Sequence, residues 1–137
     1  MMFSKPVKPG WPSFFYYHFP FLLFAAAILT VSQIPNLRGP ELRIVPFDKL
    51  AHFSEYSILA FLTFRSFSRL GTPKRLSTRA LAAVLFIACF AALDEFSQKF
   101  VPGRVSDPKD FLTDITGALL VVLFFWLRRL RMDQKQN

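Results

Sequence analysis

Acidic side chains in this chain lie inside or against long apolar runs. Eight of the nine acidic residues fall in the segments 41–55 and 94–114, and both segments continue into apolar sequence. An unpaired ionisable group at membrane depth is unfavourable by several kcal/mol, on the order of 3, so such groups commonly mark a functional site. This pattern restricts the fold, because the helices that carry the acids must turn them toward one another and away from lipid.

The apolar runs predict an all-α membrane protein. The chain has 137 residues, 53% of them hydrophobic, including 18 Phe, and several windows approach the roughly 20 apolar residues that cross a bilayer. We expect one membrane domain over residues 1–137, built as a bundle of four transmembrane helices. The first run has a signal-peptide-like charge order but no cleavage motif, so we expect it to be retained. The predicted helices are 14–34, 47–68, 79–100 and 109–131.

Basic residues indicate the orientation and exclude one class of partner. The net charge is +8, but Lys and Arg flank the apolar runs and there is no soluble basic domain, so nucleic acid is not an expected partner. The two tails and the loop after the second helix contain eleven Lys and Arg, and the other two loops contain six. The positive-inside rule therefore predicts that both termini are cytoplasmic. The single cysteine, Cys89, fits a packing role.

Three groups of polar side chains have helical spacing, which predicts that each group lines one helix face. They are Asp48, His52, Glu55 and Tyr56; Asp94 and Gln98, with Glu95 adjacent; and Asp107, Asp110 and Asp114, with Arg104 in the preceding turn. Asp94 lies 15 residues beyond Arg79, or about 22 Å along a helix. We therefore expect His52, Asp94, Glu95, Arg104 and Asp110 to surround one cavity in the outer half of the membrane.

The adjacent acids Asp94 and Glu95 are the hardest of these residues to explain by structure alone. Two carboxylates inside an apolar run need a cationic partner, protonation or a bound cation. We expect Arg104 to hold at least one of them, because a guanidinium binds a carboxylate in bidentate fashion.

Simpler explanations exist for other members of the set. Asp48 and Asp110 could be first-turn charges favoured by the helix dipole. Lys49, Lys99 and Lys109 fit lysines that extend toward the membrane surface.

The ordered polar motifs resemble the VanZ-like family. The resemblance rests on Asp48-Lys49, His52, Tyr56, Asp94-Glu95, Gln98, Pro102-Gly103-Arg104, Asp107, Asp110 and Gly117. Asp114 departs from the pattern, because the family commonly has Asn there. The family is named for a protein linked to resistance to teicoplanin, a lipoglycopeptide antibiotic. The resemblance implies an integral membrane protein of the bacterial envelope, in the inner membrane, and supplies no reaction.

The sequence leaves two classes of function open. In the first, an outward-facing site binds or modifies a membrane lipid or a lipid-linked, amphiphilic envelope molecule. His52, Asp94 and Glu95 are then the acid–base candidates. The expected ligand-binding residues are Asp48, Tyr56, Gln98, Arg104, Asp107, Asp110 and Asp114.

In the second class, the same charges form a structural salt-bridge network in a scaffold that docks a membrane protein or a second copy of the chain. No cofactor is assigned. His52 and the carboxylates are suitable hard ligands, but one His without a ligand-spaced pair argues against a structural zinc site, and no metal site is predicted.

Overall fold

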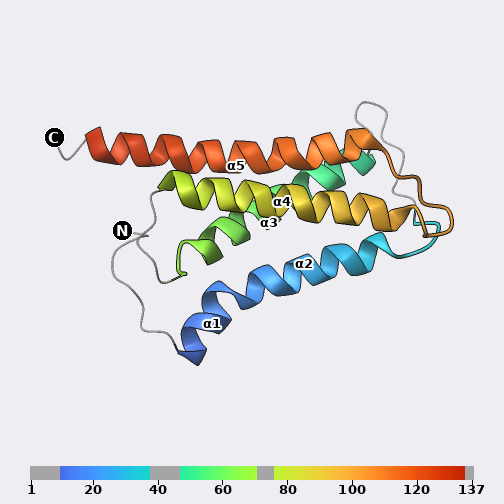
Figure 1. Cartoon of the computed structure of the whole chain (residues 1–137), viewed down its shortest axis with the longest axis horizontal. Helices are drawn as coiled ribbons and strands as arrows, with labels where there is room; N and C mark the ends of the chain where they lie inside the picture. The colour runs from blue at the N-terminus through green and yellow to red at the C-terminus, as the bar shows by residue number, and fades with distance from the viewer. Residues whose placement is uncertain (1–9, 38–46, 71–75, 135–137) are drawn as a thin grey trace.

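The computed structural model describes residues 10–37, 47–70 and 76–134, which form five helices and no strand. The helices are α1 (Trp11–Tyr17), α2 (Phe19–Ser32), α3 (Phe47–Phe67), α4 (Leu76–Gln98) and α5 (Pro108–Gln134). Helices α2 to α5 run side by side along the bundle (Figure 1). The all-α prediction is confirmed, and each predicted helix is present with ends shifted by a few residues. The first is divided in two.

The division of the first helix follows from Pro20. Helices α1 and α2 meet at His18 with a bend of 43°. Proline has no N–H and its ring displaces the carbonyl four residues earlier, which here belongs to Tyr16. This carbonyl oxygen accepts a hydrogen bond from a side chain of α3 instead, the Nη2 of Arg65. The imidazole Nδ1 of His18 also lies 2.7 Å from Ser66 Oγ. The bend is therefore fastened to the end of α3.

Among the described residues, two helices are long and apolar enough to cross a membrane by themselves. They are Ser77–Gln98 in α4 and Pro108–Arg128 in α5, and the bent pair of α1 and α2 makes a third if it counts as one span. The prediction of four spans is thus supported only in part, because α3 does not meet the same criteria. Asp48, Lys49, Glu55 and Arg65 lower the hydropathy of α3.

The helix that fails this test is the central one. Helix α3 packs against each of the other four, and Tyr56, Leu59 and Thr63 on it have no exposed surface. The face of α3 that packs against its neighbours does not meet lipid, so this face can carry polar side chains, whereas Leu50, Ile58 and Phe61 on the other face are exposed. Gly117 lets α5 come close to α3, since a Cβ there would lie 2.8 Å from the carbonyl oxygen of Phe53.

The outer faces of α4 and α5 are apolar. Large hydrophobic side chains are exposed there, including Leu81, Leu85, Leu93, Phe96, Leu112, Leu119, Leu123 and Phe124. An apolar surface of this extent suits contact with lipid. We call the end of the bundle where α2 and α4 finish and α3 and α5 begin the polar end; it lies on the right of Figure 1. All three polar groups identified in the sequence lie at this end.

Candidate functional site

A pocket of about 370 Å³ opens at the polar end between α2, α3, α4 and the turn that leads to α5. Its wall combines apolar and ionisable side chains. The lining residues are Ile28, Val31, Ser32, Leu37, Phe47, Asp48, Ala51, His52, Glu55, Asp94, Gln98 and Arg104. Helical spacing explains why three of these residues come from α3: Asp48, His52 and Glu55 are four and three residues apart and therefore lie on one face of that helix.

The turn between α4 and α5 positions Arg104. Gly103 has φ of +77°, and a Cβ there would come within 2.1 Å of Asn36 Oδ1, so this position requires glycine. The N–H of Asn36 donates to the carbonyl of Pro102 over 3.1 Å. The turn is thereby held against the segment after α2, and the guanidinium of Arg104 reaches the pocket.

Arg104 does not pair with the two adjacent acids, so the sequence prediction of that ion pair is wrong. Its Nη2 donates to the carbonyl of Val31 over 2.9 Å, and its Nε is buried and has no hydrogen-bond partner among the described residues. The ion pairs among the described residues involve Lys49 and His52 instead. The reason is geometric: the turn directs Arg104 toward the end of α2, where the carbonyl of Val31 accepts its hydrogen bond in addition to that of the Ile34 N–H.

Asp94 is held by two neutral donors. Tyr56 Oη donates to Asp94 Oδ2 over 3.2 Å, and Gln98 Nε2 donates to the same oxygen over 3.3 Å. Asp94 is 2% exposed, and its other oxygen, Oδ1, has no hydrogen-bond partner in the part of the chain that the structure describes. This carboxyl group contributes to the pocket wall.

Glu95 turns the other way, toward the start of α5. Its Oε2 accepts hydrogen bonds of 3.1 Å from Ser106 Oγ and from the N–H of Asp107. The other oxygen, Oε1, is buried, and no described residue forms a hydrogen bond with it. Two adjacent helical residues point about 100° apart, so Asp94 and Glu95 serve different sides of α4.

Lys49 is the cation at the centre of the acidic group, a position that sequence reasoning missed by assigning it to the membrane surface. Its ammonium lies 3.0 Å from Asp107 Oδ2 and also contacts Asp110. Asp107 caps α5 as well, since its Oδ1 accepts the N–H of Lys109 over 2.9 Å in front of Pro108. This N–H and the ammonium of Lys49 hold the pKa of Asp107 below its usual range. The sequence contained a sign of this position, because Lys49 is three residues before His52 and therefore lies near it on the same side of the helix.

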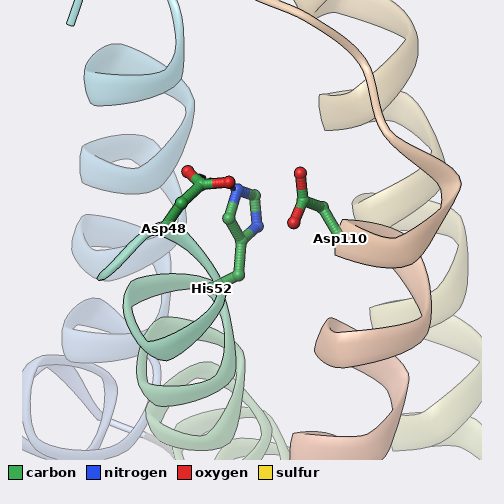
Figure 2. Close-up of side chains that lie close together, drawn as sticks. All are labelled: Asp48, His52 and Asp110. Atoms are coloured by element: carbon green, nitrogen blue, oxygen red, sulfur yellow. Dashed lines mark ion pairs between the residues drawn. The ribbon is translucent and has the colours of Figure 1, made fainter. Parts of the chain in front are cut away.

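His52 lies between α3 and α5 with carboxylates on both sides. Its Nδ1 is 3.1 Å from Asp114 Oδ1, and its Nε2 is 4.0 Å from Asp48 Oδ1. Figure 2 shows the ring between Asp48, from its own helix, and Asp110, which faces it from α5. Asp114 is completely buried, and its second oxygen, Oδ2, has no hydrogen-bond partner within residues 10–37, 47–70 and 76–134.

With this geometry in view, comparison with known proteins identifies the family. A family model described as VanZ/LLP1 matches residues 9–129. The chain belongs to the VanZ/LLP1 family. Together with its span-like helices, this makes it a membrane protein of that family. No curated protein and no solved structure matches it.

In this VanZ/LLP1 chain the predicted site residues gather at one end of the bundle. Some line the pocket, and the others lie between the helices that surround it. The pocket wall contains Asp48, His52, Asp94, Gln98 and Arg104. The remaining predicted residues, which the pocket wall does not include, are Tyr56, Glu95, Asp107, Asp110 and Asp114. Of the five expected to surround one cavity, Glu95 and Asp110 therefore lie outside it, and His52 is the residue that joins the two environments. Glu55 lines the pocket as well.

Proposed function

We propose that this protein binds a lipid-linked or amphiphilic molecule of the bacterial envelope in the pocket at its polar end. The observation that carries the proposal is that the pocket wall has an apolar part and an ionisable part. One part is apolar and consists of Ile28, Val31, Leu37, Phe47 and Ala51. An acyl or isoprenoid chain fits such a surface, whereas a polar headgroup fits the ionisable part.

The polar part of the wall has unused hydrogen-bonding capacity. Asp94 Oδ1 and Arg104 Nε are buried, and neither has a hydrogen-bond partner among the residues that the structure describes. Buried polar atoms are normally satisfied, so a headgroup that supplies an acceptor to Arg104 and a donor to Asp94 complements the pocket. Arg104 would bind a phosphate or carboxylate, and Asp94 an amine or hydroxyl.

The proposal places the polar end at the outer leaflet of the cytoplasmic membrane, with both termini inside. The excess of Lys and Arg, eleven against six, supports this orientation. In this arrangement α3 is a fourth span, whose buried polar residues His52, Tyr56 and Thr63 face its neighbours. An amphiphile could then enter the pocket sideways from the membrane.

A chemical step at the same site is the enzymatic form of the proposal. His52 and Asp94 face the pocket and are the acid–base candidates, with Arg104 as the anion-binding group. Glu95 points toward α5, so in this form it acts indirectly. A contribution to glycopeptide resistance would follow if the bound molecule is the antibiotic itself or the cell-wall precursor that it recognises.

Native mass spectrometry of the detergent-purified chain tests ligand binding. We expect a lipid-linked species to remain bound after extensive washing. Ala51→Trp, which fills the pocket, should remove this species, whereas Ala92→Trp on the exposed face of α4 should retain it. Equal retention by the two variants, or the absence of any such species from the wild type, would refute the proposal.

The alternative is a scaffold whose charges are only structural. The contacts of Lys49 with Asp107 and Asp110, and of His52 with Asp114, favour it because they join α3 to α5. Asp94→Asn distinguishes the two functions. A binding site predicts loss of the ligand at unchanged abundance in the membrane, whereas a structural network predicts that abundance falls while the ligand-to-protein ratio stays constant.

A further inference from the structure

Three potential metal ligands meet on the side of His52 that faces α5. His52, Glu95 and Asp114 each place one ligand atom within 4.8 Å of those of the other two. Their exposed fractions are 8%, 7% and 0%, so all three are nine-tenths buried or more. They come from three different helices, α3, α4 and α5, and we call them the buried triad.

Two buried carboxylate oxygens of the triad accept no hydrogen bond from the described residues. Glu95 Oε1 and Asp114 Oδ2 are both buried and have no hydrogen-bond partner among the described residues. No Lys or Arg in that part of the chain forms an ion pair with either carboxylate, because the ammonium of Lys49 is directed at Asp107 and Asp110. Buried carboxylate oxygens without donors are unfavourable unless a cation or a proton joins them.

We propose that the buried triad binds a divalent transition-metal ion, Zn²⁺ or Mn²⁺. One imidazole nitrogen and two carboxylate oxygens form a donor set that suits these ions. His52 Nδ1 and Asp114 Oδ1 are 3.1 Å apart, close to the spacing of about 3.0–3.4 Å expected between neighbouring ligands of one such ion. A neutral imidazole with two carboxylates has a charge that balances the ion.

Neighbouring groups orient the side chains of the triad, as hydrogen bonds to the ligands do in metal sites. Ser106 Oγ and the N–H of Asp107 both donate to Glu95 Oε2 and leave Oε1 free for the ion. Asp48 Oδ1 lies 4.0 Å from His52 Nε2. A small approach would allow Nε2–H to donate to Asp48 while Nδ1 binds the metal.

A second set, Asp48, His52 and Asp110, also has the spacing of metal ligands. Figure 2 shows the carboxyl groups of Asp48 and Asp110 on either side of the His52 ring. Asp110 already contacts the ammonium of Lys49, and Asp48 is exposed, so this set is the weaker one. The metal proposal replaces the sequence expectation of no metal site, and it does not depend on lipid binding, because only His52 belongs to both sites.

Metal analysis of the full-length chain in detergent provides the test. The tag-free protein is treated with a chelator, incubated with ZnCl₂ or MnCl₂, freed of excess ion and measured by inductively coupled plasma mass spectrometry. We expect one equivalent of metal and a metal-dependent rise in the melting temperature. Glu95→Gln and Asp114→Asn should each weaken binding at least tenfold, whereas Glu55→Gln, a half-buried carboxylate outside the triad, should not.

A spectroscopic measurement on the wild type does not depend on how well the variants fold. Electron spin echo spectra of the Mn²⁺-loaded protein should show coupling to an imidazole nitrogen. Less than 0.2 equivalent of either metal in the wild type, or Mn²⁺ without nitrogen coupling, would overturn the proposal. Binding lost in Asp48→Asn and retained in Glu95→Gln would assign the ion to the other set and also overturn it.

Discussion

The imidazole of His52 and the carboxyl group of Asp114 approach to 3.1 Å across the interface of α3 and α5. Both side chains are buried, and they are 62 residues apart in the sequence. A polar contact of this kind, surrounded by packed helices, contributes to the relative placement of the two helices because neither group can find water as a substitute. It also connects the pocket to the buried carboxylates behind it.

The first prediction concerns this contact. His52→Ala removes the one hydrogen-bond donor that Asp114 has among the described residues, and Asp114→Ala removes the acceptor of His52. Each single change should lower the free energy of unfolding. The loss in the double variant should be smaller than the sum of the two single losses by about 1–3 kcal/mol. Thermal unfolding in detergent containing a chelator measures the cycle. Strictly additive losses would show that the two side chains are not coupled.

The second prediction concerns Lys49. Lys49→Met removes the cation between Asp107 and Asp110 and should lower stability by about 1–3 kcal/mol, since Asp110 is buried and loses its charged partner. Lys109→Met is the matched control, because Lys109 is exposed, and its effect should stay within about 0.5 kcal/mol. If the two variants melt at the same temperature, Lys49 lies at the membrane surface, as the sequence first indicated.

Close approach of α3 and α5 motivates the third prediction. A Cβ at position 117 would lie 2.6 Å from Ser57 Oγ and 2.8 Å from the carbonyl oxygen of Phe53. Gly117→Ala gains helix propensity of about 1 kcal/mol, but overpacking against a backbone atom costs about 1–3 kcal/mol. We expect a net loss of stability. Thr116→Ala, at an exposed position of the same helix, should change the melting temperature little, and a stabilised Gly117→Ala variant would contradict this packing.

Topology is the subject of the fourth prediction. In a Cys89→Ala background, Val105→Cys at the polar end should react with an impermeant thiol reagent in intact cells, and Thr72→Cys should react only after lysis. Val105 is 82% exposed, so its labelling reports membrane side rather than burial. Gly103 is unsuitable for this purpose because a side chain there collides with Asn36. The reverse labelling pattern would place the pocket in the cytoplasm.

Helix positions and polar faces could be predicted from the sequence, because apolar runs and spacings of three and four residues report local geometry. These patterns led to the four helical segments and to Asp48, His52 and Asp94 as groups that line the pocket. The family resemblance, confirmed by the match over residues 9–129, likewise rested on the order of motifs along the chain. None of this information depends on how the helices pack.

The partners of the charged groups were decided by tertiary structure alone. Arg104 was expected to bind Asp94 or Glu95, but the turn at Gly103 directs it to the carbonyl of Val31. Lys49 was assigned to the membrane surface, yet the packing of α3 on α5 places it against Asp107 and Asp110. Spacing within a helix predicts which face a side chain occupies, whereas its partner depends on the rotation and separation of a different helix, which these spacings do not encode.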